Sequence, residues 1–275
     1  MLKICWFVAL LFLPLPLHAL GGDNGQVIKI CGSGDSQVLL RNLGQAYEKL
    51  HPGIRVQVPD SIGSSGGVKA TAGGQCDLGR TARPLKKKEK RFNLIYKVFA
   101  RSPVVFVVSA NLESVRNLTS QQVVSIFAGK IRSWQDIGGP SGKIYVANRE
   151  KGDSSRTIIE KHLIDFALIE KPVGATIYST PETMHIIATH DNTIAYGPLA
   201  AVKTEKGVRV LAYEGVIPDI EALGAKEYPL FSEFGLVWRQ DVSALALNFV
   251  KFLDTHEARK IIYGYGAAPV VPEKI

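Results

Sequence analysis

The sequence predicts an α/β protein, and two observations carry this prediction. Apolar segments of strand length alternate with segments whose apolar residues recur every three to four positions, which is the spacing of one helix face. Several of the strands also end in short Gly- and Ser-rich turns that open a helix. This succession is typical of a mainly parallel sheet flanked by helices, in which ligands bind at the carboxyl ends of the strands.

The first strand and helix show the pattern clearly. Residues 27–31 form an apolar strand that breaks into the turn GSGDS at 32–36. Apolar residues then recur at helical spacing until the His-Pro-Gly sequence at 51–53, which ends the helix. Residues 54–58 alternate as a second strand, and a short helix is expected to begin near Ser65.

The later elements repeat the alternation. Residues 102–110 are a continuous apolar strand, of the kind that is buried on both faces of a sheet. An amphipathic helix follows and ends at Gly129, and a polar loop then leads into a helix that begins at about Ser154. Further elements are expected as strands within 192–200, 209–216 and 232–239 and as a helix over 242–256. No repeat or compositional break marks a domain boundary.

Composition and charge limit the possible functions. The chain has 275 residues, of which 46% are hydrophobic and 21% are charged, an ordinary globular composition that argues against disorder. A formal charge of +8 favours anionic partners. The basic run KKKEKR at 86–91 is short, contains Glu89 and has no interleaved aromatic residues. A solvated surface is therefore favoured over nucleic-acid binding.

The N-terminal segment has the layout of a secretory signal peptide. Lys3 is followed by an apolar core over 4–17 and by the small residue Ala19, after which we expect cleavage. Two prolines within the core argue against a membrane-spanning helix. We therefore predict a signal peptide over 1–19 and a periplasmic or secreted protein.

Two cysteines, Cys31 and Cys76, remain after removal of that segment. An even pair in an oxidising compartment indicates a disulfide, with two buried thiols as the alternative. Two cysteines without neighbouring histidines make a poor metal site, and no metal is predicted.

Three turns share one physical design, since each is a Gly- and Ser-rich segment that follows a strand and opens a helix. They lie at 33–36, 63–67 and 152–155. Free backbone N–H groups and the positive end of the helix dipole make each helix start an anion site. Four serines add hydroxyl donors: Ser36, Ser64, Ser154 and Ser155. Arg149 precedes the third turn, and its planar guanidinium suits an oxyanion.

Signatures of nucleotide binding and of metalloproteases are missing from the sequence. The turns lack the pattern GxxxxGK[ST], and the chain contains no HExxH. Binding of a small anion, without catalysis and without a cofactor, is therefore predicted. A phosphatase or phosphotransferase is the enzymatic alternative, and it would need a metal cluster or an activated nucleophile.

Several motifs resemble, in their order, those of the phosphate-binding proteins of ABC importers, the PstS family. They are GSGDS, GSSGGVK, CDLGRTARPL, FAGKIRSWQDIGG, NREKGDSSR and VKFLDTHEARKIIYGYGAAPV, and they cover nearly the whole chain after residue 19. The resemblance implies a two-lobed type II periplasmic-binding-protein fold. Each lobe would be a mainly parallel sheet flanked by helices, and two strands would form the hinge. Lobe I would comprise 20–106 and 231–275, with lobe II inserted over 107–230.

The same resemblance implies a set of ligand contacts. The set is Ser36, Gln37, Ser64, Arg149, Ser154 and Ser155. To it we add Asp153, as a candidate proton acceptor, and Ser65 of the second turn. Gln37 would contribute its backbone N–H, Arg149 its guanidinium, and the serines hydroxyl or backbone donors. Glycine in the second turn would let its backbone close on a small tetrahedral anion.

Two positions depart from the family's pattern. Ala82 stands where the family has a carboxylate that accepts a proton from the ligand, and Asp153 stands where it has serine. Hydrogen phosphate can donate an O–H whereas sulfate cannot, so a missing acceptor would relax selectivity. We hypothesise that Asp153, or else Asp35, replaces the missing carboxylate. The alternative is that Asp153 caps its helix and points away from the ligand.

Arg80, Arg83 and Arg156 are further positive charges that the sequence places near the cleft. Each could pair with Asp153, bind the anion directly or face solvent.

The sequence thus predicts an exported, monomeric protein that captures inorganic phosphate and delivers it to the membrane permease of an ABC importer. Sulfate or molybdate would be the alternative ligands if Ala82 relaxes selectivity. A receptor that reports phosphate to a membrane sensor without transport is a further alternative. Nucleic acid is not a predicted partner.

Overall fold

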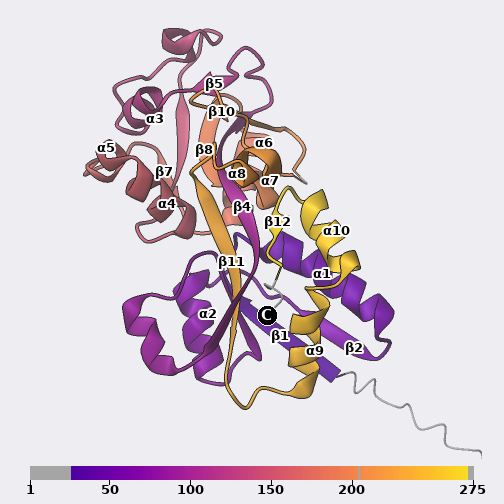
Figure 1. The fold of residues 1–275 in the computed structure, drawn as a ribbon. Coiled ribbons are helices and arrows are strands. Elements are labelled where there is room, and N and C mark those ends of the chain that lie inside the picture. The colour runs from indigo at the N-terminus through magenta and orange to yellow at the C-terminus, as the bar shows by residue number, and fades with distance from the viewer. Residues whose placement is uncertain (1–25, 204, 272–275) are drawn as a thin grey trace, which may run out of the picture.

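The structure is a computed structural model that describes residues 26–203 and 205–271. Figure 1 shows the elements in two groups, with the long strands β4 (Ile95–Ser109) and β11 (Phe231–Trp238) running between them. The α/β class predicted from the sequence is confirmed. The predicted signal peptide at 1–19 lies outside the described residues. Among the described helices, none combines the length and the apolar character needed to cross a membrane.

The other strands are shorter than β4 and β11. They are β1 (Gln26–Gly32), β2 (Ile54–Gln57), β3 (Leu78–Thr81), β5 (Asn117–Leu118), β6 (Tyr145–Arg149), β7 (Ala175–Ile177), β8 (Thr193–Pro198), β9 (Val208–Val210), β10 (Ala212–Tyr213) and β12 (Ala268–Pro269). Within the described residues, the main sheet has the order β2-β1-β3-β11-β4-β8-β6-β7, with β9 and β12 also paired to β4. Strands β5 and β10 form a separate pair.

The sheet is parallel at both ends of this order and antiparallel in the middle. Strand β1 pairs in parallel with β2 and β3, and β6 pairs in parallel with β7 and β8. Every antiparallel pair among the described strands involves β4 or β11. Each end is therefore a parallel α/β unit, and the two units are joined through the same two strands.

The helices cover both units. They are α1 (Gln37–Leu50), α2 (Gly63–Ala72), α3 (Ser120–Phe127), α4 (Ser154–His162), α5 (Ile164–Ala167), α6 (Thr180–Thr189), α7 (Leu199–Val202), α8 (Ile220–Gly224), α9 (Ala244–Phe252) and α10 (His256–Gly264). Among the described residues there are also two 3₁₀ helices, η1 (Lys87–Phe92) and η2 (Trp134–Ile137).

Separate clusters of buried hydrophobic side chains define the lobes, one large cluster in lobe I and two clusters in lobe II among the described residues. The core of lobe I collects buried side chains from 28–100 and 234–267, together with Ala200 of α7. The buried side chains of lobe II come from 104–230. Apolar burial is the main favourable contribution to the free energy of folding, so each lobe is stabilised by its own buried side chains.

The chain passes between the lobes within β4 and β11. Ala100 of β4 packs in the core of lobe I, whereas Val104 packs in the core of lobe II. On the return, the change falls between Leu230 and Phe234. The two strands pair along this passage, and the Val104 N–H donates to the Leu230 carbonyl at 2.8 Å. These strands form the two-strand connection that the family resemblance implies.

Strand β4 begins at Ile95, well before the expected start at 102. Its first half contains charged residues, which hid it from a search for apolar runs. Lys97 pairs with Asp254 at 2.5 Å, and a second pair of the same kind joins Arg101 to Glu233 of β11 at 3.0 Å. The charged half of the strand is therefore part of the sheet.

Glycines in the segment 63–80 allow close packing of α2 against the sheet. A Cβ on Gly67 would lie 2.6 Å from the Gly32 Cα, and a Cβ on Gly79 would lie 2.6 Å from the Thr71 Oγ1. Such distances are far below van der Waals contact. Part of the glycine content therefore serves helix-to-strand packing, in addition to the backbone approach that we expected in the turn.

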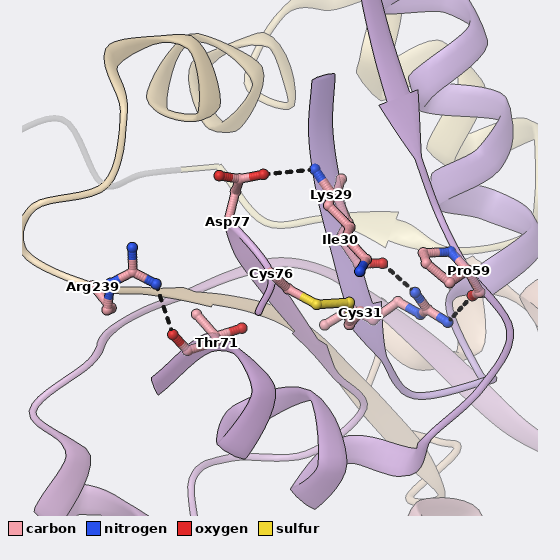
Figure 2. The surroundings of a disulfide bond; sticks show 9 residues. Lys29, Ile30, Cys31, Pro59, Thr71, Cys76, Asp77 and Arg239 are labelled. Atoms are coloured by element: carbon pink, nitrogen blue, oxygen red, sulfur yellow. Dashed lines mark hydrogen bonds between the residues drawn. A yellow bond between two sulfur atoms is a disulfide. The ribbon is translucent and has the colours of Figure 1, made fainter. Parts of the chain in front are cut away.

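Cys31 and Cys76 form a disulfide in the structure, with their Cα atoms 6.1 Å apart (Figure 2). The bond joins Cys31, near the end of β1, to Cys76, which lies two positions before the first residue of β3. Beside it, the Lys29 N–H donates to the Asp77 carboxylate at 2.8 Å. The disulfide thus fixes β1 and the start of β3, and both strands lead to the candidate site.

Candidate functional site

A cavity of about 280 Å³ lies between the two lobes. Its lining residues come from the turns and starts of α1, α2 and α4, from the segment that precedes α6 and, in the case of Arg83, from the segment after β3. They are Ser33, Gly34, Ser61, Ile62, Gly63, Ser64, Ser65, Gly66, Arg83, Arg149, Glu150, Gly152, Asp153, Ser154 and Tyr178. The three turns singled out in the sequence therefore meet at one place.

Four helices begin around this cavity. Helices α1, α2 and α4 start at the turns just named, and α6 starts at Thr180 against the first turn. A Cβ on Gly34 would lie 3.2 Å from the Thr180 backbone nitrogen, which shows how closely α6 approaches. Because the unpaired N–H groups and the dipole of each helix favour negative charge at its N-terminus, the arrangement favours an anion.

Three side-chain hydrogen bonds join the lobes at the cavity. The Ser64 and Ser154 hydroxyls lie 3.1 Å apart. From lobe II, the Ser155 hydroxyl donates to one oxygen of Asp35 at 3.3 Å. The Thr180 hydroxyl donates to the other oxygen at 2.5 Å. The lobes are thus in contact through the same polar residues that surround the cavity.

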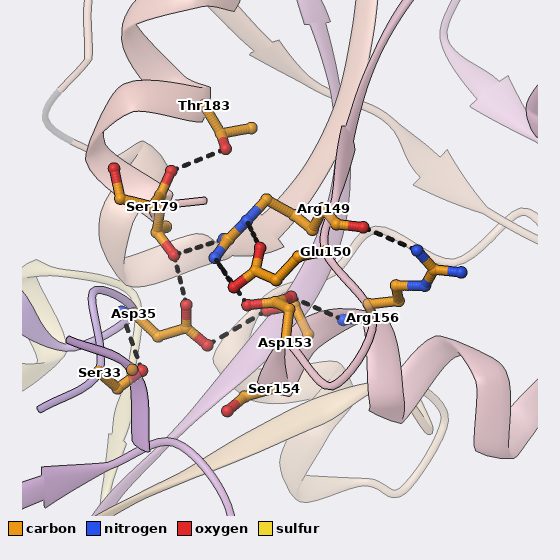
Figure 3. A network of polar contacts seen from close by, with 12 residues as sticks. Ser33, Asp35, Arg149, Glu150, Asp153, Ser154, Arg156, Ser179 and Thr183 are labelled. Atoms are coloured by element: carbon orange, nitrogen blue, oxygen red, sulfur yellow. Dashed lines mark hydrogen bonds and ion pairs between the residues drawn. The ribbon is translucent and has the colours of Figure 1, made fainter. Parts of the chain in front are cut away.

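Arg149 is the central cation of the site, and its side chain is almost fully buried. Its guanidinium donates to the Ile177 carbonyl at 3.0 Å and to the Thr180 hydroxyl at 2.8 Å. It also pairs with Asp153 at 2.9 Å and with Glu150 at 3.1 Å (Figure 3). Burial opposes the charged form, but the neighbouring carboxylates outweigh it and raise the pKa of Arg149.

Asp153 lines the cavity and also caps α4. Its Oδ1 accepts from the Arg156 N–H at 2.9 Å, while its Oδ2 pairs with Arg149. Burial and the charge of Asp35 raise the pKa of Asp153 from 3.8 to about 7, although Arg149 opposes the shift. The helix cap proposed as the alternative is therefore present, but the carboxylate does not point away from the cavity.

Asp35 lies deeper than Asp153 and is 2% exposed. Figure 3 shows its carboxylate directed from lobe I toward the Arg149 network of lobe II. Burial raises the pKa of Asp35, and Arg149 opposes this effect. Both carboxylates that were considered as proton acceptors therefore lie at the junction of the lobes.

Ser36 and Ser155 lie behind the cavity wall and are fully buried. The Ser36 hydroxyl has no hydrogen-bond partner among the described residues. A buried hydroxyl without a partner is unfavourable by about 1–3 kcal/mol, so the Ser36 hydroxyl is an unused donor, although Ser36 does not line the cavity. Ala82 is also buried, and its N–H donates to the Ser64 hydroxyl at 3.2 Å.

Ser65 and Arg83 form one wall of the cavity, and both side chains are hydrogen-bonded to Glu89. Arg83 binds both oxygens of Glu89 at 2.8 Å, and it also donates to the Ser65 hydroxyl at 2.8 Å. The Ser65 hydroxyl in turn donates to Glu89. Although burial opposes it, these hydrogen bonds lower the pKa of Glu89 to about 2.

The structure places Arg80 beneath the first turn. It is 0% exposed, and its guanidinium donates to the carbonyls of Ser33, Ile30 and Pro59. Burial lowers the pKa of Arg80 to about 10. Its side chain therefore supports the turn before α1 and does not reach the cavity.

The structure places Gln37 and Arg156 outside the lining of the cavity. The Gln37 N–H donates to the Gly34 carbonyl at 3.1 Å within its own turn. Arg156 donates to the Arg149 carbonyl at 2.8 Å and pairs with Glu160 at 2.7 Å, on the side away from Ser154 (Figure 3). Neither residue lines the cavity.

Sequence reasoning missed Thr180, Glu150 and Tyr178. Thr180 contacts both Asp35 and Arg149, and the other two line the cavity. The sequence Ser-Thr-Pro-Glu at 179–182 is a helix start, with Ser179 as the cap and proline in the first turn. That signal marks a fourth helix N-terminus, but it does not show that the start of α6 lies against the turn before α1.

Cation-binding chemistry has little support at this site. Within residues 26–203 and 205–271, no cluster of three or more His, Cys, Asp or Glu side chains is arranged to hold a metal. The arrangement can instead hold a small anion by hydrogen bonds and one guanidinium, with two carboxylates as proton acceptors.

A polar cavity between two α/β lobes, joined by two strands, defines a two-lobed solute-binding protein. The chain belongs to the family described as the PBP superfamily domain, which matches residues 21–256. It is similar to the phosphate-binding protein PstS of Borreliella burgdorferi, with 23% identity over 97% of this chain and 98% of that protein. The PstS of Bacillus subtilis is 25% identical over 90% of this chain and 82% of that protein. These relatives confirm the predicted resemblance.

A solved structure supports the same fold. A putative phosphate ABC transporter substrate-binding protein from Clostridium perfringens, determined with bound phosphate, superposes with a TM-score of 0.77 at 21% identity. The match covers 89% of this chain and 100% of that chain. The two-lobed fold predicted from the sequence is thereby confirmed.

Proposed function

We propose that this chain is an exported binding protein that captures inorganic phosphate between its lobes and delivers it to the permease of an ABC importer. The observation that carries the proposal is the meeting of two helix N-termini from opposite lobes, where the Ser64 and Ser154 hydroxyls are 3.1 Å apart beside Arg149. The phosphate-binding relatives support the same ligand.

The donors suit a tetrahedral oxyanion. Ser36 and Ser64 offer hydroxyls from lobe I, and Ser154 offers its hydroxyl and backbone from the start of α4. Arg149 supplies a buried guanidinium, whose fork matches two oxygens of the ligand. Ser155 would complete the set once its hydroxyl is released from Asp35.

Selectivity would come from the carboxylates Asp153 and Asp35. A carboxylate accepts the proton of hydrogen phosphate, whereas it meets fully ionised sulfate as a bare like charge. Two such charges ~4 Å apart at an effective dielectric of ~20 repel by about 4 kcal/mol, or about a thousandfold in affinity. The position of Ala82 would then not relax selectivity, because other side chains supply the acceptor.

Transport would use movement of the lobes about β4 and β11. Phosphate would favour the arrangement in which lobe I (20–106 and 231–275) and lobe II (107–230) are in contact, because its donors come from both. The proposal includes that the protein is a monomer and that the permease recognises the form in which the lobes are in contact. It does not include catalysis, since the cavity offers anion-binding donors and the named relatives are phosphate-binding proteins.

Calorimetric titration of ligand-free protein with phosphate, repeated in excess sulfate, tests the proposal. Tight phosphate binding that sulfate leaves unchanged is expected. Loss of the phosphate signal in sulfate would instead indicate a general oxyanion receptor, and absence of heat with phosphate would overturn the proposal. Turnover of a chromogenic phosphomonoester would revive the enzymatic alternative.

A further inference from the structure

The 3₁₀ helix η1 and its first flanking residue present an unusual density of positive charge. Five exposed cations lie in a run of six residues: Lys86, Lys87, Lys88, Lys90 and Arg91. None of them forms an ion pair with another described residue. The cavity does not use these charges, since none of the five lines it.

The one acid of this run, Glu89, faces inward. It is 3% exposed, and its carboxylate accepts from Arg83, from the Ser65 hydroxyl and from the Lys86 N–H at 2.8 Å. An exposed glutamate would partly neutralise the neighbouring cations. The Glu89 carboxylate is instead paired with Arg83 inside the wall of the cavity. The surface of η1 is therefore purely cationic, and Glu89 holds it in a fixed position.

A second hollow, of about 150 Å³, lies directly behind this wall. It is lined by Ser65, Lys69, Lys88, Glu89, Arg91 and Phe92. Ser65 lines both spaces, and the ion pair between Arg83 and Glu89 joins the two linings. Three cations thus surround a space of small-anion size beside the ligand cavity.

The charges around the cavity indicate a role for the cations that line the second hollow. Asp35, Glu150 and Asp153 surround Arg149, while the charge of Arg83 is paired with Glu89. Carboxylates therefore outnumber free guanidinium groups beside the cavity, so the side chains there add little long-range attraction for an anion to that of the helix N-termini. Cations beside an opening raise the local anion concentration and can raise association rates by about 10- to 1,000-fold.

We propose that the hollow lined by Lys69, Lys88 and Arg91 is a peripheral anion-binding subsite that collects the oxyanion and feeds the cavity. This inference rests on the proposed function and adds a second, weaker site to it. The three side chains are exposed and hydrated, so the subsite holds the anion briefly and acts on the association rate. The closed complex, which is made by other residues, keeps its dissociation rate.

Stopped-flow association of inorganic phosphate with the protein, followed by intrinsic fluorescence, tests the subsite. The double variant Lys88→Gln/Arg91→Gln is expected to slow association by roughly three- to tenfold at low ionic strength, with an unchanged dissociation rate. The difference should vanish near ~1 M salt, where the screening length is about 3 Å. Lys251→Gln/Lys260→Gln removes the same charge from α9 and α10 and should leave the rate nearly unchanged.

A second control lies on η1 itself. Lys87→Gln/Lys90→Gln removes two cations that do not line the hollow, and a smaller effect is expected. Equal slowing by both η1 variants would overturn a defined subsite, and so would an association rate equal to that of the α9 and α10 control. If the unaltered protein binds no phosphate, the proposed function fails as well; if it binds phosphate and only the rate comparison fails, the proposed function stands.

Discussion

Asp153 binds the N-terminus of α4 with one oxygen and Arg149 with the other, so its position is fixed by contacts within lobe II. Its sequence position alone allowed a cap or a ligand contact, and the structure shows a cap whose carboxylate also lines the cavity. A carboxylate held in this way cannot turn away when a like-charged ligand approaches. Its charge is therefore available for discrimination between anions.

Asp153→Asn tests this role. The amide oxygen can still cap α4, so phosphate binding should persist, while sulfate should compete at least about tenfold better because the like charge is gone. Phosphate calorimetry over a series of sulfate concentrations measures the change. Asp165→Asn, an exposed change on α5, is the control. Unchanged competition would assign the acceptor role to Asp35.

Arg149→Lys tests the guanidinium. Lysine keeps the charge but cannot replace the planar fork that contacts Ile177, Thr180 and Asp153 at once. We expect phosphate affinity to fall by about 2 kcal/mol or more, which is roughly 30-fold in Kd. Arg156→Lys, seven positions along the same chain segment but outside the cavity, should bind phosphate normally. Equal affinity of the two variants would contradict the role of Arg149.

The candidate site could be predicted in part because its donors lie at helix starts. Ser64 and Ser154 follow strands in the sequence and Arg149 ends one, and the carboxyl ends of parallel strands meet at one edge. The burial of Arg80 could not be predicted in this way, since it depends on carbonyls of Ser33, Ile30 and Pro59 that the fold brings beneath one turn. The hydrogen bond between Thr180 and Asp35 could not be predicted either, because the two residues are 145 positions apart in the sequence.

At the scale of elements, the packing of α2 on β1 depends on Gly67. Gly67→Ala places a methyl group 2.6 Å from the Gly32 Cα and 2.7 Å from the Cys31 carbonyl oxygen, both backbone atoms that cannot move aside alone. We expect the free energy of unfolding to fall by about 1–3 kcal/mol. Chemical denaturation measures it.

Gly224→Ala in α8 is the matched control for Gly67→Ala. No atom lies within 4 Å of the added methyl group, and alanine favours a helix by about 0.5–1 kcal/mol over glycine. The control variant should therefore be unchanged or slightly stabilised. Equal stability of both variants would show that α2 can move away from β1 without cost.

The disulfide stabilises the same region by a different mechanism. It closes a segment with a sequence separation of 45, which by chain entropy stabilises the fold by roughly 4 kcal/mol. Cys31→Ser/Cys76→Ser should lose about 2–4 kcal/mol of unfolding free energy. Treatment of the unaltered protein with a reductant should produce a similar loss, and a reductant should not affect the variant. A reductant-insensitive unaltered protein would contradict the role of the bond.

Elements with apolar periodicity could be predicted well, and charged ones less well. Helix α1 and strand β1 begin within a residue or two of expectation because their buried faces are apolar throughout. The basic segment of η1 was interpreted as a solvated surface, which fits its cations. Its anchoring through Glu89 depends on Arg83 and Ser65, two residues whose proximity only the fold reveals.

At the scale of the whole molecule, contact between the lobes is linked to protonation. The contact buries Asp35 and Asp153 beside Glu150, with Arg149 as their shared cation. Burial raises the pKa of Asp35, and it raises that of Asp153 from 3.8 to about 7. A raised carboxyl pKa means that the closed arrangement binds protons more tightly than the open one. Closure therefore takes up protons, and it is fully favoured below about pH 4 and weakened as pH rises through about 7.

We therefore predict that the phosphate-free protein opens as pH rises. Its radius of gyration by small-angle X-ray scattering should increase between about pH 5 and about pH 8, since both carboxylates then ionise beside a single guanidinium. Glu89 does not contribute, because its pKa of about 2 leaves it ionised throughout this range. Asp35→Asn/Asp153→Asn should remove the pH dependence. A radius that is constant in the unaltered protein, or that still changes in the variant, would show that these two carboxylates do not control the contact between the lobes.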